Sequence, residues 1–155
     1  DSLGTDDVNS ATTSLFVNSV LDDDNDAEAF IAMATSTPAS NTGLVAGDYS
    51  QIGRTRQHAG SQDKNITDIT TGQYLDWFLD STGIDSINAT TVVAFSFQEG
   101  HDFTDTPFVG VNQNNQISAS SAENADNNDP RLIIEHTVAL VAVVEDPKAS
   151  IIWLQ

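Results

Sequence analysis

The amino-acid sequence predicts an all-β protein, an antiparallel β-sandwich of jelly-roll type with at most one or two short helical turns. Short runs rich in β-branched and aromatic residues recur along the 155 residues, and turns rich in Asn, Asp and Gly separate them. No segment sustains a helical spacing of apolar residues over many turns. About seven or eight short strands without helices between them are typical of sandwiches and jelly rolls.

The predicted strands share alternating apolar residues bounded by turn signals, and they cover residues 11–17, 27–35, 74–79, 91–98, 117–121 and 132–144, with a weak strand pair within 57–70. The first two are expected to form a hairpin around the acidic turn 22–26. In the second strand Phe30 alternates with Ala32 and Ile31 alternates with Met33, so both faces are expected to be covered.

The connections between strands are expected to be loops with little helix. Residues 36–53 contain Pro, Gly, Asn and Ser and predict a long loop with one short helical turn near 45–49. Residues 80–88 predict a second helical turn, because Asp80 or Ser81 can cap it.

The C-terminal part of the chain is its most apolar part. Residues 132–144 are almost continuously apolar and β-branched, which predicts a strand covered on both faces. We therefore divide the chain into a β-sandwich module over 1–137 and an apolar C-terminal strand or tail over 138–155. The tail either completes the sheet or pairs with another subunit, and we favour pairing because exposed apolar edges invite it.

The charge balance narrows the classes of partner. The chain has 23 acidic and 5 basic residues, a formal net charge of −18 and no cysteine. Such a surface repels phosphate backbones and anionic lipids, so neither nucleic acid nor a membrane is expected as a partner. Without cysteine, neither a disulfide framework nor a thiolate metal site is available.

Several phrases resemble, in order, β-sandwich modules of phage and environmental-virus structural proteins, which are similar in style to DNRLRE-type carbohydrate-binding modules. The matching phrases are residues 1–8, 10–17, 37–49, 79–84, 95–102 and 128–135. In that family earlier strands precede the opening phrase, which leaves open whether this chain lacks N-terminal strands. The family's usual Arg is replaced by Gln98. The resemblance implies a particle-surface or appendage protein, sometimes with sugar-binding relatives.

A metal site is one alternative for the acidic turn. Asp22, Asp24 and Asp26 alternate as hard oxygen donors, which calcium favours. An EF-hand loop would need Gly and Glu where Ala27 and Met33 stand, so that motif fails. We therefore expect either a solvent-exposed turn or a calcium site with few protein ligands. No other cofactor is expected.

Catalytic patterns are weak, so we expect a protein that is not an enzyme. The histidines are far apart in sequence, at His58, His101 and His136, and are expected to be surface residues or satisfied in the core. His101 with Asp102 imitates a base and its orienting acid, but no Gly-x-Ser-x-Gly elbow supplies a nucleophile. Glu99 with Asp102 or Asp105 imitates a glycosidase pair.

Aromatic side chains offer a binding hypothesis. Phe103, Phe108 and Trp153 are candidate ligand-binding residues because exposed rings stack on sugars, whereas Trp77 alternates with leucines and is expected in the core. The preferred function is a structural or interaction module of a virion-surface or extracellular assembly, such as a decoration, fibre or appendage subunit. Its partners would be other structural subunits, including copies of itself. The alternative is a carbohydrate-binding module that binds glycans.

Overall fold

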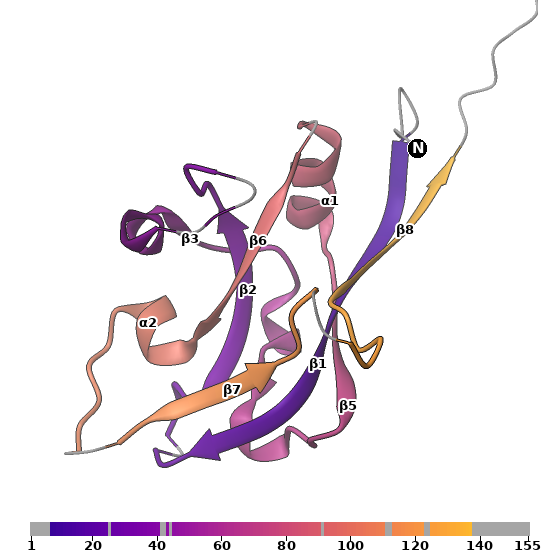
Figure 1. Ribbon diagram of the computed structural model, residues 1–155. Helices are drawn as coiled ribbons and strands as arrows, with labels where there is room; N and C mark the ends of the chain where they lie inside the picture. The colour runs from indigo at the N-terminus through magenta and orange to yellow at the C-terminus, as the bar shows by residue number, and fades with distance from the viewer. Residues whose placement is uncertain are drawn as a thin grey trace, which may run out of the picture.

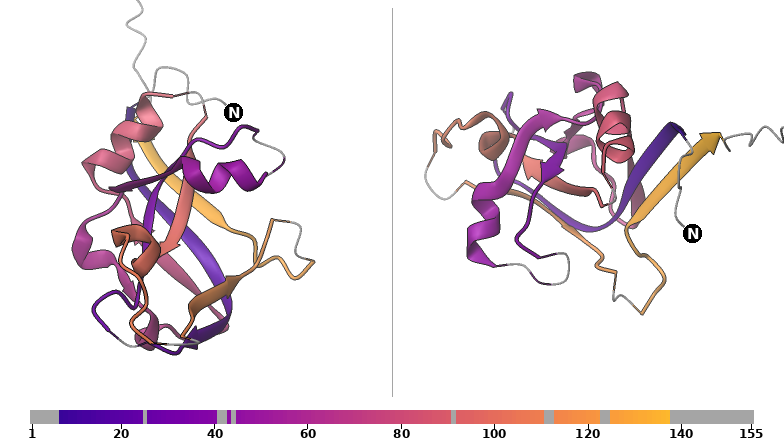
Figure 2. Two further views of the ribbon diagram at one scale, coloured as in Figure 1. Left: turned by 90° about the vertical axis from the view of Figure 1, so that its left-hand side faces the viewer. Right: turned by 90° about the horizontal axis from the view of Figure 1, so that it is seen from above.

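The computed structural model describes residues 7–24, 26–40, 43, 45–90, 92–110, 113–122 and 125–137. In this part of the chain, two antiparallel four-stranded sheets pack face to face, as the views in Figures 1 and 2 show. Two short α-helices and three 3-10 turns complete the described structure. The predicted all-β, antiparallel sandwich is therefore confirmed.

The first sheet is built on one long strand, β1 (Asp7–Asp22). One of its edges pairs with β5 (Gln73–Phe78). Its other edge pairs with β8 (Arg131–Thr137) along the first half and with β7 (Asn115–Ala119) along the second half. β1 thus occupies the centre of its sheet and has hydrogen-bonded partners on both sides.

The second sheet has the same plan around a shorter central strand, β2 (Phe30–Ser36). β6 (Ala94–Glu99) pairs with one edge of β2. β3 (Ile52–Arg56) and the two-residue β4 (Lys64–Asn65) pair with the other edge.

The predicted hairpin of the first two strands is wrong. β1 and β2 lie in different sheets, because each already has partners at both of its edges. The acidic turn between them therefore crosses from one sheet to the other. The predicted strand pair within 57–70 is wrong as well, since that range contains the two-residue β4, an isolated β-bridge from His58 to Leu79, and two 3-10 turns, η2 (Gly60–Gln62) and η3 (Ile66–Asp68).

The main core lies between the sheets and is nearly inaccessible to water. Ile31 and Met33 of the second sheet pack with Trp77 of the first sheet and with Ile66. The opposite face of β2 presents Ala32 and Ala34 to Phe103. The predictions that Trp77 is a core residue and that both faces of β2 are covered are therefore confirmed.

Helices close the sandwich at two places. α1 (Ser81–Asn88) is capped by Asp80, whose side chain accepts hydrogen bonds from the backbone N–H groups of Thr82 and Gly83, as predicted. α2 (Gly100–Thr104) follows β6 and covers the outer face of β2 with Phe103. The loop helix is η1 (Ala46–Gln51), close to the predicted turn.

The prediction that residues 132–144 are covered on both faces is wrong for the part that the structure describes. β8 lies at the edge of its sheet, and Leu132 and Ile133 are 43% and 57% exposed. Only Ile134 of this strand packs against the core residues Val8, Ala11 and Ile87. Residues 138–155, including the predicted tail, lie outside the described residues.

A buried histidine ties the second sheet to the loop that follows β3. The His58 ring Nε2 accepts a hydrogen bond from the Met33 N–H at 3.0 Å, and Nδ1–H donates to the Ala59 carbonyl at 2.9 Å. These two bonds fix the neutral tautomer with the proton on Nδ1. Among the described residues, no helix is long and apolar enough to cross a membrane.

The fold predicts that Gly100→Ala is strongly destabilising. A methyl group at Gly100 would overlap the backbone carbonyl oxygen of Glu28, whereas one at Gly47 would meet no atom within 4 Å. Thermal unfolding should show a loss of about 2 kcal/mol or more for Gly100→Ala and almost none for the control Gly47→Ala. Equal melting temperatures for the two variants would contradict this packing of α2 against the turn.

Candidate functional site

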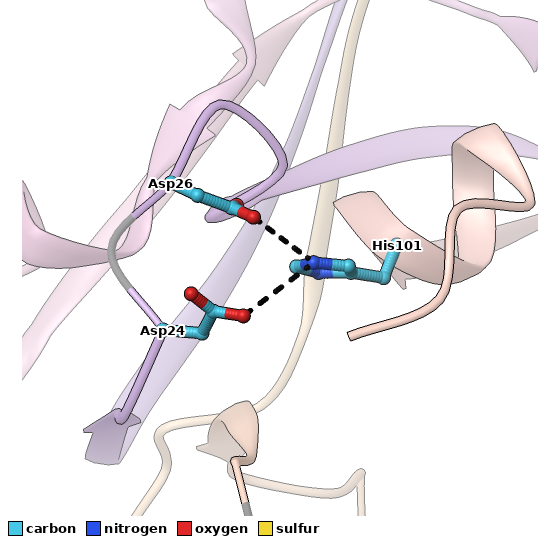
Figure 3. Close-up of side chains that lie close together, drawn as sticks. All are labelled: Asp24, Asp26 and His101. Atoms are coloured by element: carbon cyan, nitrogen blue, oxygen red, sulfur yellow. Dashed lines mark ion pairs between the residues drawn. The ribbon is translucent and has the colours of Figure 1, made fainter. Parts of the chain in front are cut away.

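The turn that crosses between the sheets brings Asp24 and Asp26 to the imidazole of His101, as Figure 3 shows. The His101 Nε2 atom lies 3.3 Å from Asp26 Oδ2 and 3.8 Å from Asp24 Oδ2. His101 is only 4% exposed, whereas Asp26 lies at the surface. The cluster of Asp24, Asp26 and His101, named here the turn cluster, therefore joins a buried imidazole to a carboxylate at the surface.

Glu99 fixes the orientation of the imidazole. Its carboxylate caps α2, because Oε2 accepts from the His101 backbone N–H at 2.8 Å. Oε1 lies 2.9 Å from Nδ1 of the His101 ring, so Nδ1 carries the proton and donates it to Glu99. The Phe108 ring stacks on the imidazole with 3.9 Å between centroids. These contacts direct Nε2 toward the two aspartates.

Asn115, the first residue of β7, fixes the turn itself. Its Oδ1 accepts from the backbone N–H groups of Asp23 and Asp24 at 3.1 and 3.0 Å. Its Nδ2 donates to the Asp24 carbonyl at 2.8 Å and to Glu99 Oε1 at 3.3 Å. The Glu28 N–H also donates to Asp26 Oδ1 at 2.8 Å. The turn cluster is therefore oriented by neighbours from three separate segments.

The electrostatic balance of the turn cluster favours positive charge. Burial acts to lower the pKa of His101, but the hydrogen bond that the ring donates to Glu99 and the charges of Glu99, Asp26 and Asp24 together raise this pKa above its ordinary value. Among the described residues, neither His101 Nε2 nor Asp24 Oδ2 has a hydrogen-bond partner, although both atoms are buried. The arrangement can hold either a proton or a cation between imidazole and carboxylates.

The acidic turn is only partly the site that the sequence suggests. Asp24 and Asp26 come together, but the Asp22 carboxylate turns away and accepts from the Thr67 hydroxyl at 2.7 Å. The contributions of His101 and Glu99 were missed by the sequence analysis. The sequence does contain one signal for them, since Glu99 ends a strand two residues before His101. This spacing lets the Glu99 side chain cap α2 and also contact the His101 ring.

The acid pairs considered for catalysis have separate partners in the structure. Glu99 bonds His101, whereas the Asp102 side chain bonds Tyr49. Asp105 lies 3.5 Å from Arg54 in an exposed ion pair. These contacts therefore do not pair His101 with Asp102. They also do not pair Glu99 with Asp102 or Asp105.

The three candidate ligand-binding aromatics lie in different surroundings. Phe103 is buried against the outer face of β2, so its ring offers no exposed stacking surface. Phe108 is half-buried and covers His101. Trp153 lies outside the described residues. Phe103 and Phe108, the two rings that the structure describes, therefore do not form a shared row.

A cavity of about 970 Å³ lies between the loop after β2 and strand β6. Tyr49 is 66% exposed at this cavity, and its pKa is raised by the hydrogen bond to Asp102 and by the negative charge of that residue. The cavity is lined by Ser36, Pro38, Ser40, Gly43, Val45, Ala46, Asp48, Tyr49, Ile52, Val92, Val93, Ala94, Phe95 and Ser96.

Asp48 holds the loop over this cavity. Its Oδ1 accepts from the Ala39 N–H and its Oδ2 from the Val45 N–H, both at 2.9 Å. These two backbone hydrogen bonds lower the pKa of Asp48 below its ordinary value of 3.8. The Asp48 carboxylate thus orders the loop by binding backbone N–H groups on both of its oxygens.

The outer face of the first sheet carries a second group of rings. The Arg131 guanidinium lies 3.7 Å from the centroid of the Tyr74 ring, which meets Phe16 edge to face. Phe78 and Ile133 are 56% and 57% exposed on the same face, since both are in register with Thr12. This face joins β5, β1 and β8 into one partly apolar surface.

Comparisons of the chain with known protein families, with curated protein sequences and with solved structures find no match.

The hydrogen bonds of Asp48 predict an acid-dependent loss of stability. Because the folded pKa of Asp48 is lowered, its contribution is present above pH 3.8 and is lost as the pH falls through the folded pKa. Asp48→Asn should lower the melting temperature at neutral pH, and the difference from the unmodified chain should shrink toward about pH 2. The control Asp85→Asn changes an exposed carboxylate in α1. A difference for Asp48→Asn that stays constant with pH would contradict the assignment.

Proposed function

We propose that this chain is a non-enzymatic structural or interaction module that associates with a second copy of itself through β8. The observation that carries the proposal is the exposure of apolar side chains on this edge strand, where Leu132 and Ile133 are 43% and 57% exposed. Single exposed apolar residues are common, but two adjacent ones on a sheet edge favour strand-to-strand pairing.

The position of β8 in the sheet supports edge pairing. Within the described residues, β1 is the only strand that pairs with β8, which places β8 at the edge of that part of the sheet. Figure 1 shows β8 running away from the body of the sandwich beside the start of β1. The sequence that follows β8 continues with apolar residues over 138–144. An added strand would extend the first sheet, with its side chains beside Leu132 on one face and beside Ile133 on the other.

The net charge of the chain sets a condition on pairing between two copies. A chain with a formal charge of −18 repels itself at low ionic strength, so any contact between copies requires an apolar centre. β8 offers one, and added salt screens the remaining repulsion. Self-association should therefore strengthen as salt concentration rises.

The proposed setting is the surface of a virion or another extracellular assembly. The support for this setting is the ordered series of phrases that resemble phage and environmental-virus structural modules, together with the sandwich architecture. A decoration, fibre or appendage subunit of this kind works by contact and requires no catalytic residues.

Sedimentation of the full chain at several concentrations and salt levels tests the proposal. The unmodified chain should form a dimer or larger assembly in high salt, and Ile133→Lys should weaken this association at least about tenfold. Val92→Lys is the matched control, because Val92 is 59% exposed and lies outside β8. A chain that remains monomeric under all conditions, or equal effects of the two variants, would rule out pairing through β8.

Carbohydrate binding is the second candidate function, and the cavity beside Tyr49 favours it. The exposed Tyr49 ring lines the same cavity as Ser36 and Ser96, which combines a stacking surface with hydroxyl groups that can bind a sugar.

A glycan screen followed by calorimetry tests this second candidate. We expect Tyr49→Ala to weaken any saturable glycan binding at least about tenfold. Phe78→Ala should leave it unchanged, because Phe78 is similarly exposed but lies on the other sheet. Binding that is insensitive to Tyr49→Ala would place the glycan site elsewhere.

A further inference from the structure

The strongest unexplained feature of the molecule is the buried nitrogen of His101. The residue is 4% exposed, and among the described residues Nε2 has no hydrogen-bond partner. With Nδ1–H donated to Glu99, Nε2 points at one carboxylate oxygen of Asp24 and one of Asp26, as Figure 3 shows. A lone pair facing carboxylates is repulsive unless a cation or a proton lies between them.

We propose that Asp24, Asp26 and His101 form a binding site for a divalent transition-metal ion of the zinc class. The inference is independent of the assembly function proposed for β8, because it concerns a different part of the sandwich.

The separations of the three ligand atoms suit such an ion. Zinc bonds nitrogen and carboxylate oxygen at about 2.1 Å, so ligands in a tetrahedral site lie about 3.4 Å apart. The distances from His101 Nε2 to Asp26 Oδ2 and Asp24 Oδ2 are 3.3 and 3.8 Å, and all three ligand atoms lie within 4.8 Å of one another. Three protein ligands leave a fourth position for water on the exposed side of Asp26.

The residues around the ligands resemble a second coordination shell. A metal-bound histidine usually donates its other ring N–H to a carboxylate, and Glu99 accepts that bond at 2.9 Å. Asp26 has its second oxygen held by the Glu28 N–H, and Asp24 has its backbone held by Asn115. The Phe108 ring covers the imidazole from one side and keeps water from that face.

The ligand set distinguishes the zinc class from calcium. Calcium takes about six to eight oxygen ligands, whereas imidazole nitrogen suits zinc and neighbouring transition metals. The third aspartate of the acidic segment, Asp22, bonds Thr67 instead of joining the turn cluster. The charges of Asp24, Asp26 and the neighbouring Glu99 compensate a divalent ion, which would fasten the crossing turn to α2.

Calorimetric titration of the full chain, stripped with a chelator and then titrated with zinc chloride, tests the proposal. We expect one zinc ion per chain and calcium binding that is at least about a hundredfold weaker. Zinc at about a hundredfold excess over its dissociation constant should raise the melting temperature by about 5–10 °C. Comparable affinities for zinc and calcium, or no saturable zinc binding, would overturn the proposal and leave a proton shared within the turn cluster.

Variants locate the bound ion. His101→Gln and Asp26→Asn should each weaken zinc binding at least about tenfold, whereas the control Asp22→Asn, in the same acidic segment, should leave it unchanged. Because Asp26 lies at the surface, Asp26→Asn provides the test even where His101→Gln disturbs folding, which circular dichroism reports. Zinc binding that survives Asp26→Asn and is lost in Asp22→Asn would overturn the assignment of the ligands.

A nitrogen-detected magnetic resonance spectrum gives an independent readout. On addition of zinc, the Nε2 resonance of His101 should shift strongly, while the His58 resonances should stay in place because both ring nitrogens of His58 are hydrogen-bonded in the core. A zinc-induced shift confined to histidines other than His101 would overturn the proposal.

Discussion

The contact between Trp77 and Phe97 joins the two sheets, since one ring belongs to β5 and the other to β6. The Trp77 ring is fully buried with Met33 and Ile31 of the central strand β2, so the apolar faces of both sheets are used in one core. This burial requires β1 and β2 to stand in opposite sheets. The chain between them must consequently cross from one layer to the other, and that crossing decides where the acidic turn lies.

The local structure of most elements was predictable from the sequence, whereas their pairing was not. Alternation located β1, β5 and β6 and identified Trp77 as a core residue, because side-chain period depends only on neighbouring positions. The same alternation does not indicate which strands pair with one another. The hairpin of the first two strands was therefore wrong, although both strands exist, because the pairing depends on burial that involves residues far away in the chain.

The candidate site, too, was predictable only where it depends on residues that are close together in the sequence. Alternating aspartates drew attention to the turn, and two of the three belong to the turn cluster. Their partner His101 follows about 75 residues later, at the first turn of a helix whose start depends on Glu99. Only the crossing of the chain between sheets brings these segments together. β8 was predicted to be covered because its composition is apolar, but composition does not report whether a strand lies at an edge.

The two surfaces used in the proposals lie in different parts of the sandwich. In both Figure 1 and the right-hand view of Figure 2, α2 and the end of β8 stand at opposite sides of the molecule. A metal at the turn cluster would therefore stabilise the sandwich without competing with pairing along β8. In this account the folded core supplies the scaffold, a cation secures one end, and the edge strand at the other end makes the contact with a neighbour.

A crystal structure of the chain grown with zinc, with diffraction recorded on both sides of the zinc absorption edge, tests this account most directly. The account predicts β1 and β2 in opposite sheets and one anomalous peak bonded to His101 Nε2, Asp24 and Asp26. A β1–β2 hairpin, or anomalous density that avoids the turn cluster, would contradict it.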